Sequence, residues 1–183
     1  RVYGTRGTCI AVEGTSITEN KAFIELANHF HKQGLPVPQV YSCSDDYSCY
    51  LQEDLGNESL FDVVSKQASS HETQALLHDT MRLLPAVQYR GAQGLDFSVC
   101  YPQPEFDRRT VMFDLNYFKY CFLKSTGLEF DEMRLENDFE AMVNVLLQQM
   151  SDTFLYRDFQ ARNVMVKDGK PYLIDFQGGR KGP

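Results

Sequence analysis

The Asp168-Gly169 pair near the C-terminal end constrains the fold more than any other feature of this sequence. It separates two β-rich runs within residues 163–176. Asp-Gly between such runs is a strong signal for a tight β-hairpin, because both turn residues must adopt positive φ. A hairpin sets the start of its first strand beside the end of its second. The sequence therefore predicts that Asn163 and Asp175 are neighbours.

A second carboxylate, that of Asp158, belongs to the same end of this hairpin. It lies five residues before Asn163, in a loop that can fold over the paired strand ends. Hard cations such as Mg²⁺ prefer oxygen ligands and complete their shell with water and substrate phosphates. A carboxylate beside them can accept the proton of a hydroxyl group. Asp158, Asn163 and Asp175 thus form a pattern typical of phosphoryl transfer.

The N-terminal part of the chain combines β-rich runs with a single helix. One run covers Thr8–Gly14, and two more fill residues 38–54. Between them, Ser16 and Glu19 fit a capping box, in which a Ser side chain and an acid three residues later satisfy free helix N–H groups. We expect a helix from there to about Gln33.

The remainder of the chain is mainly helical. Ser69 and Glu72 fit another capping box, which would open a helix to about Arg90. Two further helices are expected, at 110–124 and 131–150, each with an apolar stripe that we expect to face the core. The stripes consist of Phe113, Tyr117, Phe118, Tyr120 and Phe122 in the first helix, and Leu135, Phe139, Met142, Val143, Leu146, Leu147 and Met150 in the second. The histidines expected on helix surfaces are His29, His31, His71 and His78.

These elements predict an α+β fold in two lobes. Residues 1–54 would form a small antiparallel β lobe with one helix, and residues 55–183 a mainly helical lobe that carries the hairpin.

The composition of the chain limits what kind of partner it can bind and in which cellular compartment it is expected. The net charge of −7, from 18 basic and 25 acidic side chains, argues against a nucleic-acid partner, which requires a basic face. No apolar run of about 18 residues is present, so we expect no membrane span. The 5 cysteines are scattered without a C-x-x-C pair, which favours free thiols in a reducing cytoplasm.

The motifs around the hairpin carry a family resemblance. "YRDFQARNVMV" followed by "LIDF" resembles the H-R-D-x-x-x-x-N and D-F-G signature of the protein-kinase-like superfamily. Together with "GLPVPQV" and "YLQEDLGNESLFD" upstream, the order of features is similar to the aminoglycoside phosphotransferase and choline kinase family. In detail the motifs resemble the bacterial anomeric kinases of N-acetylhexosamines.

The resemblance implies a protein-kinase-like fold and catalytic roles for four residues. Asp158 would be the base or would orient the acceptor hydroxyl, with Arg157 orienting its loop. Asn163 and Asp175 would hold Mg²⁺. The implied reaction is transfer of the γ-phosphate of ATP to a hydroxyl group of a small molecule, an amino sugar or other sugar first and an aminoglycoside-like or choline-like amine next.

The resemblance also implies a nucleotide site in the N-terminal part. Backbone groups of Gln52, Glu53 and Asp54 would bind the adenine edge. Glu19 would pair with a lysine that binds phosphate, although its capping-box role explains it equally well.

Some positions depart from the family pattern. The lysine is missing, since Ala11 and Val12 stand where it is expected, and Arg1 or Arg6 would be the nearest substitutes. Tyr156 replaces the histidine of H-R-D, and Gln177 replaces the glycine of D-F-G. No Gly-rich phosphate loop is visible, and we expect the chain to be truncated at both ends, leaving the kinase fold incomplete.

Two other functions remain open. The missing lysine favours a catalytically impaired pseudokinase that only binds nucleotide. The "RDFQARN" segment is also similar to the catalytic loop of protein kinases, but 104 residues separate Asp54 from Asp158, and so long a segment resembles the small-molecule kinases instead. The oligomeric state is not indicated.

Overall fold

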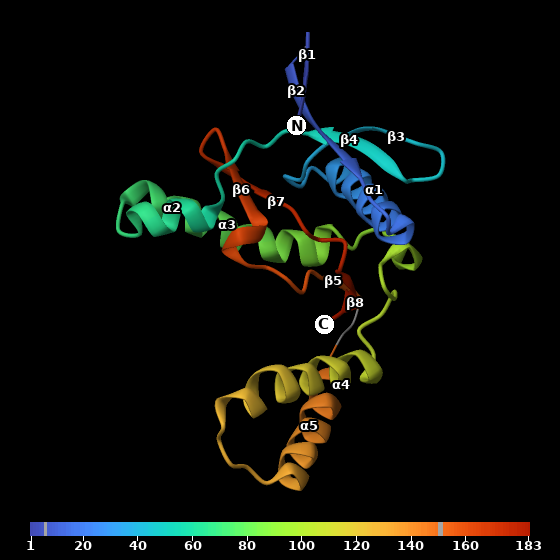
Figure 1. Ribbon diagram of the computed structural model, residues 1–183, viewed down its shortest axis with the longest axis vertical. Helices are drawn as coiled ribbons and strands as arrows, with labels where there is room; N and C mark the ends of the chain where they lie inside the picture. The colour runs from blue at the N-terminus through green and yellow to red at the C-terminus, as the bar shows by residue number, and fades with distance from the viewer. Residues whose placement is uncertain (6, 150–151) are drawn as a thin grey trace.

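The N-terminal part of the chain folds as a four-stranded antiparallel sheet (Figure 1). The structure is a computed structural model that describes residues 1–5, 7–149 and 152–183. The strands are β1 (Val2–Gly4), β2 (Gly7–Glu13), β3 (Val40–Cys43) and β4 (Cys49–Glu53), in the order β1-β2-β4-β3. The registers Cys9 to Glu53 and Val40 to Gln52 place the end of β4 between two neighbouring strands.

The helix α1 (Ile17–Lys32) lies beside this sheet. It forms because apolar residues recur at helical spacing along one face, and seven of its residues are buried. Gly34, at φ 68°, ends it in the left-handed conformation that glycine adopts without strain. The capping box predicted at its start is wrong, because the Ser16 side chain makes no capping hydrogen bond.

The helices of the second part are α2 (Leu60–Gln67), α3 (His71–Pro85), α4 (Arg108–Tyr117) and α5 (Glu132–Leu147). A complete capping box occurs at α2, where Ser59 and Asp62 bond each other's backbone N–H groups. The box predicted at Ser69 is wrong by one residue. Ser70 caps α3 and accepts from the Thr73 N–H, so the helix begins at the second of two adjacent serines.

The C-terminal segment pairs with itself twice. Strands β6 (Val164–Lys167) and β7 (Lys170–Leu173) form the hairpin predicted from Asp168-Gly169, whose φ angles of 51° and 71° are those that this turn requires. Strands β5 (Thr153–Leu155) and β8 (Arg180–Gly182) form a second antiparallel pair.

Aromatic rings join the sheet, α1 and the C-terminal segment into one core. Phe23 of α1 stacks on Tyr50 of β4 and on Phe176, with ring centroids 5.2 Å apart in both pairs. Phe30 meets Phe154 and Phe176 edge-on at 5.0 and 5.4 Å. Phe30, Phe154 and Phe176 are fully buried. The ring that follows Asp175 is therefore anchored on α1.

The region of α4 and α5 differs from this core and corrects the expectation drawn from its apolar stripes. The aromatic stripe of the first helix is exposed, with Phe113 at 69% and Phe122 at 58%. In α5 only Phe139 and Val143 are buried, while Met142 and Leu147 are exposed; Met150 lies outside the described residues. Helical periodicity alone does not say which face another element covers.

Beyond α4 the helix continues through a π-helical turn, Phe118–Phe122, and a 3₁₀ turn, Leu123–Thr126. Lys119 is buried at this turn and pairs with Glu136 at 2.7 Å and Glu132 at 3.0 Å on α5. These ion pairs connect the two helices.

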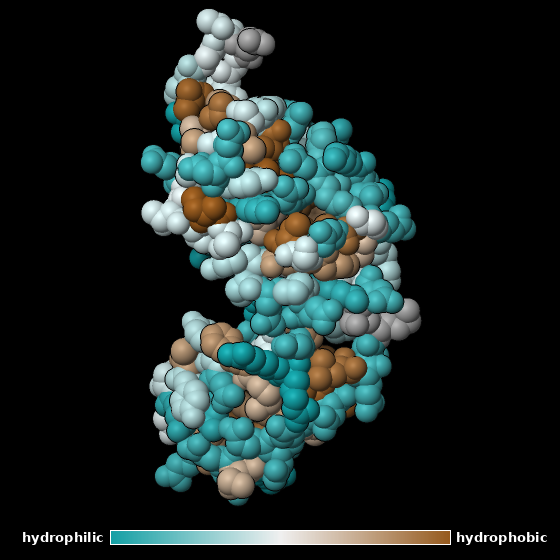
Figure 2. All heavy atoms as spheres, turned by 90° about the vertical axis from the view of Figure 1, so that its right-hand side faces the viewer, coloured by the Kyte–Doolittle hydropathy of each residue, from teal (hydrophilic) through white to brown (hydrophobic). Residues whose placement is uncertain are grey.

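The molecule is elongated, with the sheet and α1 at one end and α4 and α5 at the other (Figure 1). Figure 2 shows the surface hollowed between these two ends. Within the described ranges, no helix combines the length and the apolar character needed to cross a membrane.

Candidate active site

The β6–β7 hairpin brings the predicted polar residues together. Asn163 is buried just before β6, and its amide Nδ2 donates to the Asp158 carbonyl oxygen and to Asp175 Oδ2, both at 3.0 Å. The Asn163 carbonyl oxygen in turn accepts from the Ile174 N–H at 3.0 Å. One amide group therefore fixes the loop of Asp158 against the strand end that carries Asp175.

These hydrogen bonds determine which side-chain oxygen atoms are left to bind a cation. Because the Asn163 amide faces two oxygen acceptors, the NH₂ group must point toward them, and Oδ1 is left as an acceptor. Asp175 adds a carboxylate beside it. This set fits Mg²⁺, which takes few protein oxygens and fills its shell with water and phosphate. It does not resemble a closed protein cage, and no group of three or more His, Cys, Asp or Glu side chains suited to a metal occurs among the described residues.

Tyr156 holds the backbone beside Asp175 in place. Its hydroxyl donates to the Ile174 carbonyl oxygen, next to Asp175, and its side chain is only 2% exposed. Burial, followed by the charges of Asp175 and Asp158, raises the pKa of Tyr156 well above its ordinary value. The tyrosine therefore stays a neutral donor, and the residue in place of the family histidine has a clear structural role.

Two residues of the motif adopt left-handed backbone conformations. Arg157 has φ 70° and Asp175 has φ 63°, which costs non-glycine residues roughly 1–3 kcal/mol each. Arg157 Nη2 binds both carboxylate oxygens of Asp114 on α4, at 2.6 and 2.7 Å. The surrounding contacts thus hold the loop in a conformation that it would not adopt alone.

Glu19 of α1 reaches the site through Gln177. The Gln177 amide Nε2 lies 2.8 Å from Asp175 Oδ1 and 3.5 Å from Glu19 Oε1. No lysine of β2 is available to Glu19, since Ala11 and Val12 occupy that part of the strand. The amide of Gln177 is therefore the neighbour of Glu19 in this structure, while the predicted phosphate role of Glu19 stays a prediction.

Arg1, one of the two arginines suggested as substitutes for the lysine, does not fill its place. Arg1 is engaged with the segment after β4, where Nε pairs with Asp54 Oδ2 at 2.6 Å and Nη2 donates to Asn57 Oδ1 at 2.7 Å. Arg6 lies outside the described residues.

The predicted adenine-binding segment connects the sheet to the hairpin. Glu53 pairs with Lys167 of β6 at 2.6 Å. The N–H of Glu53 already donates to the Gln39 carbonyl oxygen at 2.8 Å. If Gln52, Glu53 and Asp54 bind an adenine edge, the contacts must come from their other backbone groups.

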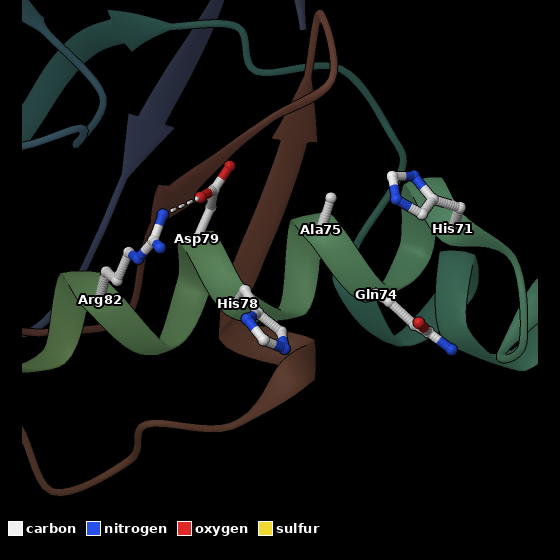
Figure 3. A pocket seen from close by; sticks show the side chains of 6 residues that line it. All are labelled: His71, Gln74, Ala75, His78, Asp79 and Arg82. Atoms are coloured by element: carbon white, nitrogen blue, oxygen red, sulfur yellow. Dashed lines mark hydrogen bonds and ion pairs between the residues drawn. The ribbon is translucent and has the colours of Figure 1, made fainter.

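A shallow pocket of about 320 Å³ lies on the outer face of α3, but its residues do not form a site (Figure 3). His71 and Asp79 point to one side of the helix, while Gln74 and His78 point to the other. His31, His71 and His78 are exposed, as predicted; His29 is half-buried and contacts the Gly91 carbonyl oxygen at 2.8 Å.

A model of the phosphotransferase enzyme family matches residues 13–183, which include every element of the site. The chain belongs to this phosphotransferase enzyme family. The prediction made from the catalytic motifs is therefore confirmed at the level of the family.

Two curated relatives of the chain are named as kinases of N-acetylated amino sugars. An N-acetylmuramate/N-acetylglucosamine kinase of Neisseria meningitidis serogroup B is 29% identical over 151 residues, which are 80% of this chain and 43% of that protein. A kinase of the same name from Pseudomonas aeruginosa is 23% identical over 167 residues, 89% of this chain and 46% of that protein. The chain thus spans less than half the length of these curated relatives.

Solved phosphotransferase structures share the fold. The ternary complex of streptomycin, ATP and APH(2")-IIa matches with a TM-score of 0.64 at 18% identity, over 95% of this chain and 60% of that one. The gentamicin complex of APH(2")-IIa matches with a TM-score of 0.63 at 17% identity, over the same shares. The predicted α+β kinase-like fold is confirmed.

Sequence reasoning missed several residues around the candidate site. Tyr156 and Gln177 were noted only as departures from the motif, although a polar residue at each of these positions signals a hydrogen bond to the Asp175 segment. Lys167 gave no signal, because its partner Glu53 is 114 residues away in sequence. Arg180 gave none either, and among the described residues it is the largest fully buried side chain.

Proposed function

We propose that this chain carries the catalytic part of an ATP-dependent kinase that phosphorylates a hydroxyl group of an N-acetylated amino sugar. The observation that carries the proposal is the Asn163 amide, which holds the Asp158 loop and the Asp175 carboxylate at one point. Support for the acceptor comes from the sugar kinases named above. Free thiols throughout the chain favour a cytoplasmic location.

Each residue of the site then has a role in the proposed reaction. Asp158 accepts the hydroxyl proton or orients the hydroxyl toward the phosphate. Asn163 Oδ1 and Asp175 would hold Mg²⁺, which neutralises phosphate charge when bound. Arg157 and Tyr156 hold the loop in place, so that catalysis rests mainly on positioning. Backbone groups of Gln52 to Asp54 contact the adenine, and Glu19 with Gln177 borders the phosphates.

The test is an ATP-consumption assay of the intact protein with N-acetylglucosamine, N-acetylmuramate, an aminoglycoside, choline and a peptide pool. Asp158→Asn and Asp175→Asn should each lower kcat by roughly a thousandfold, the range expected for a general base or a metal ligand. Asp168→Asn, in the hairpin turn, is a matched control that should keep full activity, because Asn also tolerates positive φ. Turnover on peptides alone would refute the proposal.

A second function, a pseudokinase that only binds nucleotide, is favoured by the contact of Glu19 with Gln177 in place of a lysine. The pseudokinase would be established, and the proposed kinase function overturned, by two results together. The protein would bind nucleotide equally well with and without Asp175→Asn, and it would turn over none of the acceptors.

A further inference from the structure

A cavity of about 360 Å³ lies beside the catalytic loop, between α4 and the start of β8. Arg157 forms part of its wall, so the cavity adjoins the residue before Asp158. Arg109, Asp114 and Arg180 contribute the other charged side chains. None of these three was assigned a role in binding a substrate by the sequence motifs.

Arg180 is the unusual member of this wall. It is 1% exposed, and its Nε has no hydrogen-bond partner among the described residues. The one hydrogen bond that its Nη2 makes is to the Gly178 carbonyl oxygen, at 3.3 Å. A buried guanidinium without a paired charge is costly. An anion bound in the cavity beside Arg180 would supply the partner that its Nε lacks.

The other charges of the wall do not compensate Arg180 on balance. The Asp114 carboxylate is already bound by Arg157, through both of its oxygens. Burial, and next the positive charge of Arg157, lower the pKa of Arg180, while Asp114, Cys100 and Asp107 act more weakly in the opposite sense. With Arg109 exposed at the rim, the wall carries three guanidinium groups and one carboxylate.

We propose that this cavity recognises a carboxylate group on the sugar acceptor, with Arg180 at its base and Arg109 at its rim as the specificity-determining residues. The inference rests on the proposed sugar kinase function and goes beyond it by assigning recognition of an acidic substituent to two residues. Arginine suits this role because its planar fork binds both oxygens of a carboxylate.

The sign of the charge separates the acceptor classes. The whole protein carries a net charge of −7, so a cavity with excess positive charge is a local feature. A polycationic acceptor such as an aminoglycoside would be repelled from it, and a neutral sugar would leave Arg180 without a counter-charge. The phosphates of the nucleotide are the other anions near the site, and the experiment must distinguish them from the acceptor.

The experiment compares N-acetylmuramate with N-acetylglucosamine, which lacks the carboxylate, as acceptors for the intact protein. The readout is the ratio of their kcat/KM values, together with the KM for ATP. Arg180→Gln and Arg109→Gln should each lower the ratio, by roughly ten- to a hundredfold for the loss of a hydrogen-bonded charge. Arg180→Lys should retain part of it. The exposed Arg109 variant keeps the test valid if Arg180→Gln does not fold.

Arg108→Gln is the matched control. Arg108 neighbours Arg109 on α4 but pairs with Glu140 and Asn144 of α5, away from the cavity. It should leave the ratio unchanged. Phosphorylation of N-acetylglucosamine with no change of the ratio in either variant would overturn this inference alone, as would a loss expressed only in the KM for ATP. Phosphorylation of neither sugar would overturn the proposed function and this inference together.

Discussion

The core packed against the β6–β7 hairpin and the pair of helices α4 and α5 use similar amino acids in opposite ways. In the core, five aromatic rings from α1, β4 and the C-terminal segment pack with centroids 5.0–5.4 Å apart. In the α4 and α5 region, aromatic side chains face outward and charged pairs connect the helices. The buried rings of the first region hold the candidate site in place. The second region contributes residues of α4 to the wall of the cavity beside that site.

The sharpest test of this comparison removes one phenylalanine from each region. Phe30→Ala should lower the free energy of unfolding by about 3–5 kcal/mol, because the fully buried ring leaves a cavity between Phe154 and Phe176. Phe122→Ala, at a site 58% exposed, should cost no more than about 0.5 kcal/mol. Urea unfolding of both variants measures the difference. Similar costs would show that both regions bury their aromatics in solution.

A smaller loss of stability is expected when one asparagine of each region is replaced by alanine. Asn163→Ala should cost about 1–3 kcal/mol, because it removes the buried amide that bonds the Asp158 carbonyl oxygen and the Asp175 carboxylate. Asn116→Ala is the matched variant on α4, where the side chain donates to the Met112 carbonyl oxygen of its own helix and to no other described residue. It should be nearly neutral, since alanine favours helix. Thermal unfolding of both variants is sufficient, and equal shifts of Tm would contradict the comparison.

The two regions also differ in how far sequence could predict them. The Asp-Gly turn determines the β6–β7 hairpin locally, so the convergence of Asn163 and Asp175 followed from spacing alone. The aromatic stripe of α4 has the same helical periodicity as a core helix, yet Phe113 and its neighbours are exposed. Periodicity reports a face but not what covers it, and that depends on contacts distant in sequence.

The site shows the same limit at the level of single residues. Asp158, Asn163 and Asp175 belong to a short motif with fixed spacing. Arg180, in contrast, is buried in a strand, β8, that pairs with β5. That pairing is a tertiary contact, which no local sequence pattern predicts. The capping residues failed for a simpler reason: Ser16 has the right spacing to Glu19, but its backbone angles of −89° and 84° do not direct its side chain at the helix.

Helix caps should show where the two regions agree. Ser59→Ala at α2, whose Leu60 belongs to the core, and Asp107→Ala at α4 each remove a side chain that accepts from the helix backbone. Each should cost about 1 kcal/mol. Ser16→Ala removes no such bond and should cost only a few tenths. Chemical denaturation separates the three. Equal costs at Ser59 and Asp107 would place the difference between the regions in tertiary packing, and a much cheaper Asp107 variant would extend the difference to local structure.

The smallest expected effect concerns the ion pairs of the second region. Hydrogen bonds from Lys124 and Lys119 hold the pKa of Glu132 below its ordinary value of 4.5. A carboxyl whose pKa is lowered by folding stabilises the protein above its unfolded-state pKa, and this contribution disappears as the pH falls through the folded-state value. Unfolding measured from neutral pH to pH 3 should therefore show a loss of stability below about pH 4.5, part of which Glu132→Gln removes.

The control is Glu129→Gln, which replaces an exposed carboxylate in the loop before α5 and should leave that acid dependence unchanged. Because Glu132 is 53% exposed, solvent screens its pairs, and the change should be far smaller than that caused by Phe30→Ala. An acid dependence identical in all three proteins would mean that packing of Phe139 and Val143, and not charge, holds α4 to α5.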